Sequence, residues 1–195
     1  MSTPEILSAL VPVVDAFEEL EIAYHIGGSV ASSYYGIARA TLDVDLVADL
    51  RPEHVNPLVE RIQPDYYVDG EMIWDAIRHE SSFNLIHLET MVKVDIFVAH
   101  KHAFDDEVFR RVRQDALEEG ESARPFYLAS PEDVILRKLE WYKTSGSVSD
   151  RQWRDVLGIL AVQAAALDKA YLQRWARTLG VAELLERALT EAGLR

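Results

Sequence analysis

The stretch 25-HIGGSVASSYYGIARATLDVDLVADL-50 contains two aspartates, Asp43 and Asp45, one residue apart in an apolar run. Residues i and i+2 of a β-strand point to one face, so the two carboxylates would project together while Val44 and Leu46 face the core. Like charges this close repel each other. The pattern therefore indicates that a cation lies between the two side chains.

A third aspartate has a similar setting in the segment 91-MVKVDIFVA-99, where Asp95 lies in the middle of a predicted strand. An ionised carboxylate in an apolar strand is costly unless it is paired or bound to a metal. If this strand lies beside the strand of Asp43, the three carboxylates can hold Mg²⁺, one ion or two, and Mn²⁺ could substitute. The alternative is an ion pair between Asp95 and Lys93 or Arg39.

A double glycine precedes the aspartates, in the order Gly27, Gly28 and Ser29, after a short apolar strand. Glycines allow close approach of a ligand to the backbone, and the start of a helix offers free N–H groups to an anion. The turn is neither a Walker loop nor a Rossmann fingerprint. Taken alone, the turn is better explained as an ordinary strand-to-helix connection than as a phosphate-binding site.

Composition limits the class of protein. The chain has 195 residues, 49% of them hydrophobic, a formal net charge of −13 and no cysteine. It has no disulfide or thiolate chemistry, and its acidity opposes non-specific binding to nucleic acid. No apolar run approaches the roughly 20 residues of a membrane helix, and the N-terminus lacks the features of a signal peptide. We expect a soluble, cytoplasmic protein with no membrane partner.

Periodicity and turn residues predict an α+β fold, with a small mixed β-sheet flanked by helices and a C-terminal helical bundle. The change comes at Ser130, where the sequence SPED predicts a capped helix start. We therefore predict an α/β core over 1–130 and a helical subdomain over 131–195. Predicted strands are 22–26, 42–49, 124–130 and a hairpin within 82–99. Predicted helices are 4–20, a short one ending at Gly36, 52–62, 103–113, 131–144, 150–165, 168–179 and 181–192.

The combination of these motifs resembles the polymerase-beta-like nucleotidyltransferase superfamily. Its pattern is an apolar residue, Gly, Gly or Ser, a spacer, then Asp-apolar-Asp/Glu-apolar, and the matching residues are Gly27, Gly28, Ser29, Asp43, Asp45 and Asp95. The segment 130–160 is similar to the helical half of bacterial abortive-infection toxin nucleotidyltransferases. Lys138 matches their lysine, and Arg151 and Asp155 match the outer positions of the next helix. Gln152 stands where an aspartate is common.

The resemblance implies transfer of a nucleoside monophosphate from an NTP to an acceptor, with release of pyrophosphate. The acceptor would be an RNA or tRNA end, a protein or a small molecule. The protein would be the toxin of a toxin–antitoxin pair, with a cognate antitoxin as partner. The alternative is a catalytically inactive nucleotidyltransferase-fold binding module, or an antitoxin-like partner protein.

The same resemblance implies roles for individual residues. Asp43 and Asp45 would ligate Mg²⁺, and Asp95 would ligate a second ion or activate the acceptor hydroxyl. The turn at Gly27, Gly28 and Ser29 would hold the phosphates. Arg39 and Lys138 would also contact phosphate. For Arg39, an ion pair with an aspartate of the cluster is an equal alternative.

Two histidines, His100 and His102, stand two residues apart after a predicted strand. Imidazole nitrogens are common metal ligands, but the sequence places no third ligand beside them. We expect these two side chains to be solvated loop residues.

Overall fold

The computed structural model describes residues 3–41, 43–120 and 123–194. Its chain divides into two compact units. Unit 1 comprises Met1–Gly27 and Ala40–Leu128, and unit 2 comprises Gly28–Arg39 and Ala129–Arg195. The segment 28–39, which lies within the α/β part of the sequence, groups with the helical unit because its helix packs against two helices of that unit.

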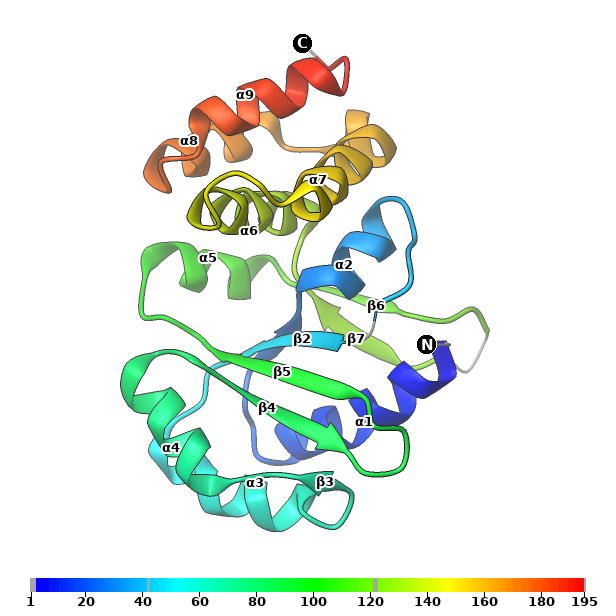
Figure 1. The fold of residues 1–195 in the computed structure, drawn as a ribbon, viewed down its shortest axis with the longest axis vertical. Helices are drawn as coiled ribbons and strands as arrows, with labels where there is room; N and C mark the ends of the chain where they lie inside the picture. The colour runs from blue at the N-terminus through cyan, green and yellow to red at the C-terminus, as the bar shows by residue number, and fades with distance from the viewer. Residues whose placement is uncertain (1–2, 42, 121–122, 195) are drawn as a thin grey trace. The chain divides into compact units, whose positions relative to one another are not determined.

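Unit 1 is built on a mixed sheet, which among the described residues has seven strands in the order β3-β4-β5-β2-β1-β7-β6 (Figure 1). Strand β2 pairs in parallel with β5 and antiparallel with β1, and β4 is antiparallel to β5. The two aspartate-bearing strands therefore lie side by side, as the hypothesis of a three-carboxylate site requires. The strands are β1 (Tyr24–Ile26), β2 (Asp43–Ala48), β3 (Tyr66–Tyr67), β4 (Ser82–His87), β5 (Lys93–Val98), β6 (Arg113–Ala116) and β7 (Pro125–Leu128).

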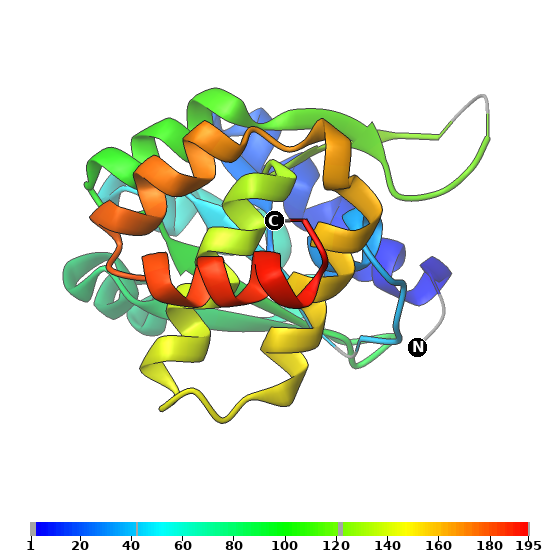
Figure 2. The same cartoon turned by 90° about the horizontal axis from the view of Figure 1, so that it is seen from above.

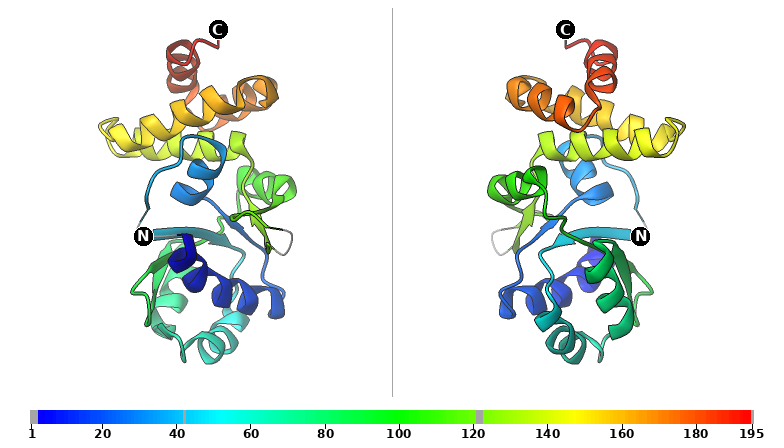
Figure 3. Two further views of the ribbon diagram at one scale, coloured as in Figure 1. Left: turned by 90° about the vertical axis from the view of Figure 1, so that its right-hand side faces the viewer. Right: turned by 90° about the vertical axis from the view of Figure 1, so that its left-hand side faces the viewer.

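Helices cover both faces of this sheet (Figures 1 and 3). On one face lie α1 (Thr3–Glu19), the short 3₁₀ helix η1 (Pro52–His54), α3 (Val55–Ile62) and α4 (Gly70–His79), whereas α5 (Ala103–Arg111) lies on the other. Alternation along β2 and β5 buries Val44, Leu46, Val94 and Ile96 completely. Because alternate side chains point to opposite faces, Asp43, Asp45 and Asp95 point away from this core.

Unit 2 consists of helices α2 (Gly28–Tyr35), α6 (Pro131–Thr144), α7 (Asp150–Gln163), η2 (Ala164–Ala166), α8 (Lys169–Thr178) and α9 (Ala182–Glu191). Figure 2 looks down on α8 and α9, which pack across α6 and α7. Helix α2 packs against α6 and α7 as well. At the start of α6, Ser130 accepts a hydrogen bond from the backbone N–H of Asp133, as its sequence predicted.

Three elements were not expected from the sequence: β3, α4 and β6. Strand β6 has exposed polar residues and no alternation, and it begins at Arg113, the last residue of the helix predicted over 103–113. The helix α5 ends at Arg111. Of the helices in the described ranges, none combines the length and apolar character that crossing a membrane requires.

Close packing of α2 against α7 generates a first prediction. A Cβ atom on Gly36 would lie 2.8 Å from the backbone nitrogen of Ile159 and 2.9 Å from the carbonyl carbon of Gly158. Because backbone atoms must move to make room, we expect Gly36→Ala to lower the free energy of unfolding by about 1–3 kcal/mol. Urea denaturation measures this change.

The control is Gly27→Ala, because a Cβ atom at Gly27 would have no neighbouring atom within 4 Å. This variant should unfold within about 0.5 kcal/mol of the unmodified protein. Equal stability of the Gly36→Ala and Gly27→Ala variants would contradict the close packing of α2 and α7.

Candidate active site

The predicted aspartates lie together on one face of the sheet in unit 1. The parallel register of β2 and β5 places Asp45 opposite Asp95 and Asp43 opposite Lys93. Side chains opposite each other in a ladder share a face, so the three carboxylates and the Lys93 ammonium all project from the same surface. All three aspartates are partly exposed. They are therefore accessible to a ligand.

The ammonium of Lys93 pairs with this acidic group. Its Nζ lies 2.6 Å from Oδ2 of Asp95. The hydrogen bond to Asp95, together with the negative charges of Asp95, Asp43 and Asp45, raises the pKa of Lys93 despite partial desolvation. The ion pair between Asp95 and Lys93 that the sequence left open is therefore present. It shows that this surface attracts positive charge.

Thr41 orients the first aspartate, because its hydroxyl donates to Oδ1 of Asp43 over 2.8 Å. The three aspartates are nevertheless not drawn into a tight cluster. In the described ranges, one set of three His, Asp or Glu side chains has ligand atoms all within 4.8 Å of one another, and it does not include them. Mutual repulsion and the pull of Lys93 on Asp95 account for this open arrangement.

The glycine turn joins β1 to α2. The backbone N–H of Gly27 donates to the carbonyl oxygen of Asp45 over 2.9 Å, which ties the turn to the aspartate strand. Gly28 has a φ of 51°, a left-handed conformation that favours glycine. The space beside Gly27 is open, as an added Cβ would meet no atom within 4 Å. The backbone here can approach a ligand closely.

The other predicted phosphate-binding side chains converge in unit 2 around Asp155 of α7. Arg39 donates from Nε and Nη2 to the two carboxylate oxygens of Asp155, over 2.9 and 3.0 Å. The same Nη2 lies 2.7 Å from Oγ of Ser29. Lys138 donates to Asp155 over 2.7 Å and to Gln152 over 3.1 Å. The structure therefore joins Arg39 and Lys138 through one carboxylate, and Ser29 contacts this network through Arg39.

Asp155 carries the negative charge of this network in a buried position. Burial alone would raise the pKa of Asp155, but hydrogen bonds from Arg39 and Lys138 outweigh it, so the pKa lies below the ordinary value of 3.8. Lys138 itself is only 4% exposed. Gln152, the departure from the toxin pattern, accepts a hydrogen bond from Lys138, whereas Arg151 is exposed.

The sequence indicated no role for Asp155, and it offered the strand aspartates as partners of Arg39. A signal for Asp155 exists, since it lies on the apolar stripe of α7 with Val156, Ile159 and Leu160, all buried. A carboxylate on an apolar stripe requires a cationic partner. The sequence gives no indication of which cation that would be.

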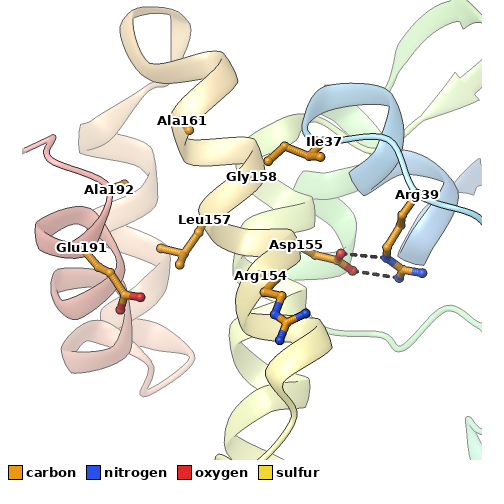
Figure 4. A pocket seen from close by; sticks show the side chains of 9 residues that line it. All are labelled: Ile37, Arg39, Arg154, Asp155, Leu157, Gly158, Ala161, Glu191 and Ala192. Atoms are coloured by element: carbon orange, nitrogen blue, oxygen red, sulfur yellow. Dashed lines mark hydrogen bonds and ion pairs between the residues drawn. The ribbon is translucent and has the colours of Figure 1, made fainter.

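A cavity of about 560 Å³ adjoins this network within unit 2 (Figure 4). Arg39 and Asp155 line it, and their paired hydrogen bonds are drawn in Figure 4. Its other lining residues are Ile37, Arg154, Leu157, Gly158, Ala161, Glu191 and Ala192. Charged side chains from Arg39, Asp155, Arg154 and Glu191 line the cavity beside its apolar residues.

Comparison with solved structures identifies the fold. A solution structure of the antibiotic-resistance factor ANT(2'')-Ia matches with a TM-score of 0.58 at 13% identity, covering 96% of this chain and 98% of that chain. A crystal structure of ANT(2'')-Ia in complex with adenylyl-2''-tobramycin matches with a TM-score of 0.55 at 16% identity, covering 91% and 98%. An antigenic nucleotidyltransferase-like protein from Paracoccidioides brasiliensis matches with a TM-score of 0.54 at 20% identity, covering 97% and 94%.

Comparisons of sequence give a different result, because no family model and no curated protein matches this chain. The likeness is therefore one of fold. It confirms the predicted α+β class, and the chain has the fold of these nucleotidyltransferase structures.

The network around Asp155 generates a second prediction. We expect Asp155→Asn to lower the free energy of unfolding by about 3–5 kcal/mol at neutral pH, because Lys138 stays buried without this anionic partner. The depressed pKa makes the contribution of Asp155 complete above pH 3.8, and it is lost as the pH falls through the lower folded-state pKa. The difference in stability between the two proteins should therefore narrow only below about pH 4.

Chemical denaturation across a series of pH values measures both effects. Arg154→Gln, at the exposed neighbouring position on α7, serves as the control and should change stability little. A difference between wild type and Asp155→Asn that stays constant down to the lowest pH would contradict the ionised state assigned to Asp155.

Proposed function

We propose that the protein is an Mg²⁺-dependent nucleotidyltransferase that moves a nucleoside monophosphate from an NTP to an acceptor. The observation that carries the proposal is the parallel register of β2 and β5, with Asp43, Asp45 and Asp95 on one face. The shared fold of the ANT(2'')-Ia structures supports it. The cytoplasm, where NTPs are available, is the compartment we propose for it.

The donor set fits Mg²⁺, which prefers carboxylate oxygens and keeps part of its shell for water and substrate phosphates. The contact with Lys93 is a second reason to expect Mg²⁺ here, because these carboxylates already interact with a positive group. Asp43, Asp45 and Asp95 would hold the metal, one ion or two, and Mn²⁺ would serve in its place. When bound, the metal supplies positive charge that offsets the charge of the triphosphate.

The residues of the chain bind and orient the substrates in this proposal. Gly27, Gly28 and Ser29 present backbone N–H groups and a hydroxyl to the phosphates. Arg39 and Lys138 add positive charge, and Asp155 fixes both side chains. A carboxylate oxygen of Asp95 takes the proton of the acceptor hydroxyl as it attacks the α-phosphorus. The bond to pyrophosphate breaks and pyrophosphate leaves.

For the acceptor, we propose a small cationic molecule. A net charge of −13 attracts cations and repels nucleic acid. One of the similar structures, that of ANT(2'')-Ia, was solved with an adenylylated aminoglycoside, adenylyl-2''-tobramycin. The alternative from the sequence is an RNA-modifying toxin with a cognate antitoxin. Incubation of the protein with labelled NTPs and either a panel of aminoglycosides or total RNA distinguishes these acceptors by which class becomes labelled.

Substitution of Asp45 generates a third prediction. Asp45→Asn should lower nucleotidyl transfer by at least about 100-fold, because a metal ligand is lost. Its stability without metal should equal or exceed that of wild type, because removing one of several like charges relieves repulsion. A labelled-NTP assay and thermal denaturation measure the two effects.

The matched control is Asp49→Asn, one residue beyond β2, where an exposed carboxylate pairs with Arg51. This variant should keep its activity. If Asp45→Asn unfolds, the carboxylate is structural.

If isothermal titration calorimetry detects no Mg²⁺-dependent binding of ATP, GTP, CTP or UTP to the wild type, the protein is instead an inactive binding module or an antitoxin-like partner.

The resident cation generates a fourth prediction. Lys93→Met should lower the melting temperature in the absence of divalent ions, because the three aspartates lose the cation that offsets their repulsion. Addition of Mg²⁺ should raise the melting temperature of this variant more than that of wild type. Differential scanning fluorimetry with and without Mg²⁺ measures both shifts. Equal responses to Mg²⁺ in both proteins would show that Lys93 and the metal do not share these ligands.

A further inference from the structure

Three possible metal-binding side chains of unit 1 lie close together, whereas the sequence indicated only two of them. Glu80, His100 and His102 each offer one ligand atom, and these atoms all lie within 4.8 Å of one another. Glu80 follows the last residue of α4, and the two histidines lie between β5 and α5. The fold therefore provides the third ligand that the His-Lys-His sequence lacks.

The geometry suits a tetrahedral metal ion. Nδ1 of His100 lies 3.3 Å from Oε2 of Glu80. Bonds of about 2.0–2.1 Å from Zn²⁺ to nitrogen and oxygen place neighbouring ligand atoms of a tetrahedron about 3.3–3.4 Å apart. The rings of His100 and His102 are stacked, with centroids 5.8 Å apart and planes inclined by 2°. The other ligand atoms have to move by no more than about 1.5 Å to reach the same spacing.

The backbone around these ligands is anchored to the sheet. The N–H of Val98 donates to the carbonyl oxygen of Ser81, and the N–H of Ala99 donates to that of Ala48, each over 2.9 Å. Ser81 follows Glu80 directly, and Ala99 precedes His100 directly. The two segments that carry the ligands are thus held near each other without a metal, which lowers the entropic cost of binding one.

A glutamate is an unusual residue for the backbone conformation at position 80. Glu80 has a φ of 46° at the end of α4, a left-handed conformation in which glycine is most common. A side chain at such a position costs free energy relative to glycine. Glycine at this position would provide no carboxylate to pair with His100, whereas Glu80 does.

We propose that Glu80, His100 and His102 bind one Zn²⁺ ion, or a transition-metal ion of similar preference, with water at the fourth position. Two imidazoles and one carboxylate favour such an ion over Mg²⁺, which takes oxygen ligands. The side chains of His100 and Glu80 are partly exposed, so the ion can enter from solvent. The bound ion joins the end of α4 to the connection between β5 and α5. The site does not depend on the proposed transferase activity.

The test is isothermal titration calorimetry of the full chain with ZnCl₂, after treatment with a chelator. To remove the proposed Mg²⁺ ligands from the measurement, the titration uses the Asp43→Asn/Asp45→Asn protein. We expect one Zn²⁺ per chain, a melting temperature that rises by several degrees with Zn²⁺, and no comparable response to Mg²⁺. His102→Ala in this background should weaken Zn²⁺ binding by at least about tenfold, and Glu80→Gln should also weaken it.

The matched control is His79→Ala, which removes an exposed histidine next to Glu80 that pairs with Asp75. This variant should bind Zn²⁺ as tightly as its parent protein. No stoichiometric Zn²⁺ binding, or binding that is unchanged in both His102→Ala and Glu80→Gln, would overturn the proposal. The contact between His100 and Glu80 would then be an ion pair alone.

Discussion

The parallel pairing of β2 with β5 is the constraint on which the candidate active site depends. This register places Asp45 opposite Asp95 on the face of the sheet that points away from the core. The same alternation buries Val44, Leu46, Val94 and Ile96 on the other face, so the packing that stabilises unit 1 also fixes the direction of the acidic side chains. Burial of the core residues therefore places three carboxylates that repel one another on the opposite face. A bound cation would offset that repulsion.

The two units satisfy their charges in different ways. In unit 2 the carboxylate of Asp155 is buried and holds two cations, Arg39 and Lys138, through short hydrogen bonds. In unit 1 the ammonium of Lys93 pairs with Asp95, one of three partly exposed carboxylates on the same face of the sheet. In the network of unit 2, Asp155 accepts hydrogen bonds from both cations, which suits a positioning role for Asp155. The surface of unit 1 keeps an excess of negative charge, which suits binding of a divalent ion.

Much of this arrangement could be predicted from local patterns. The alternation in 43-DVDLVA-48 and 93-KVDIFV-98 predicted two strands with their aspartates on one face, and the SPED sequence predicted the start of α6. Contacts between distant segments could not be predicted in this way. The partner of Arg39 is Asp155, 116 positions along the chain. The partner of His100 is Glu80, which directly follows a helix that the sequence did not indicate. Helix α4 was not predicted either. Edge strand β6 was not predicted because it is polar and has no alternation.

We propose that the aspartates of β2 and β5 bind a divalent cation. The most direct measurement is a crystal structure of the protein soaked with Mn²⁺ and a non-hydrolysable NTP analogue, with data collected to locate manganese by anomalous scattering. We expect an anomalous peak from manganese bound by carboxylate oxygens of Asp43 and Asp45. A structure that binds the analogue with no peak there, and with Lys93 still paired to Asp95, would contradict it.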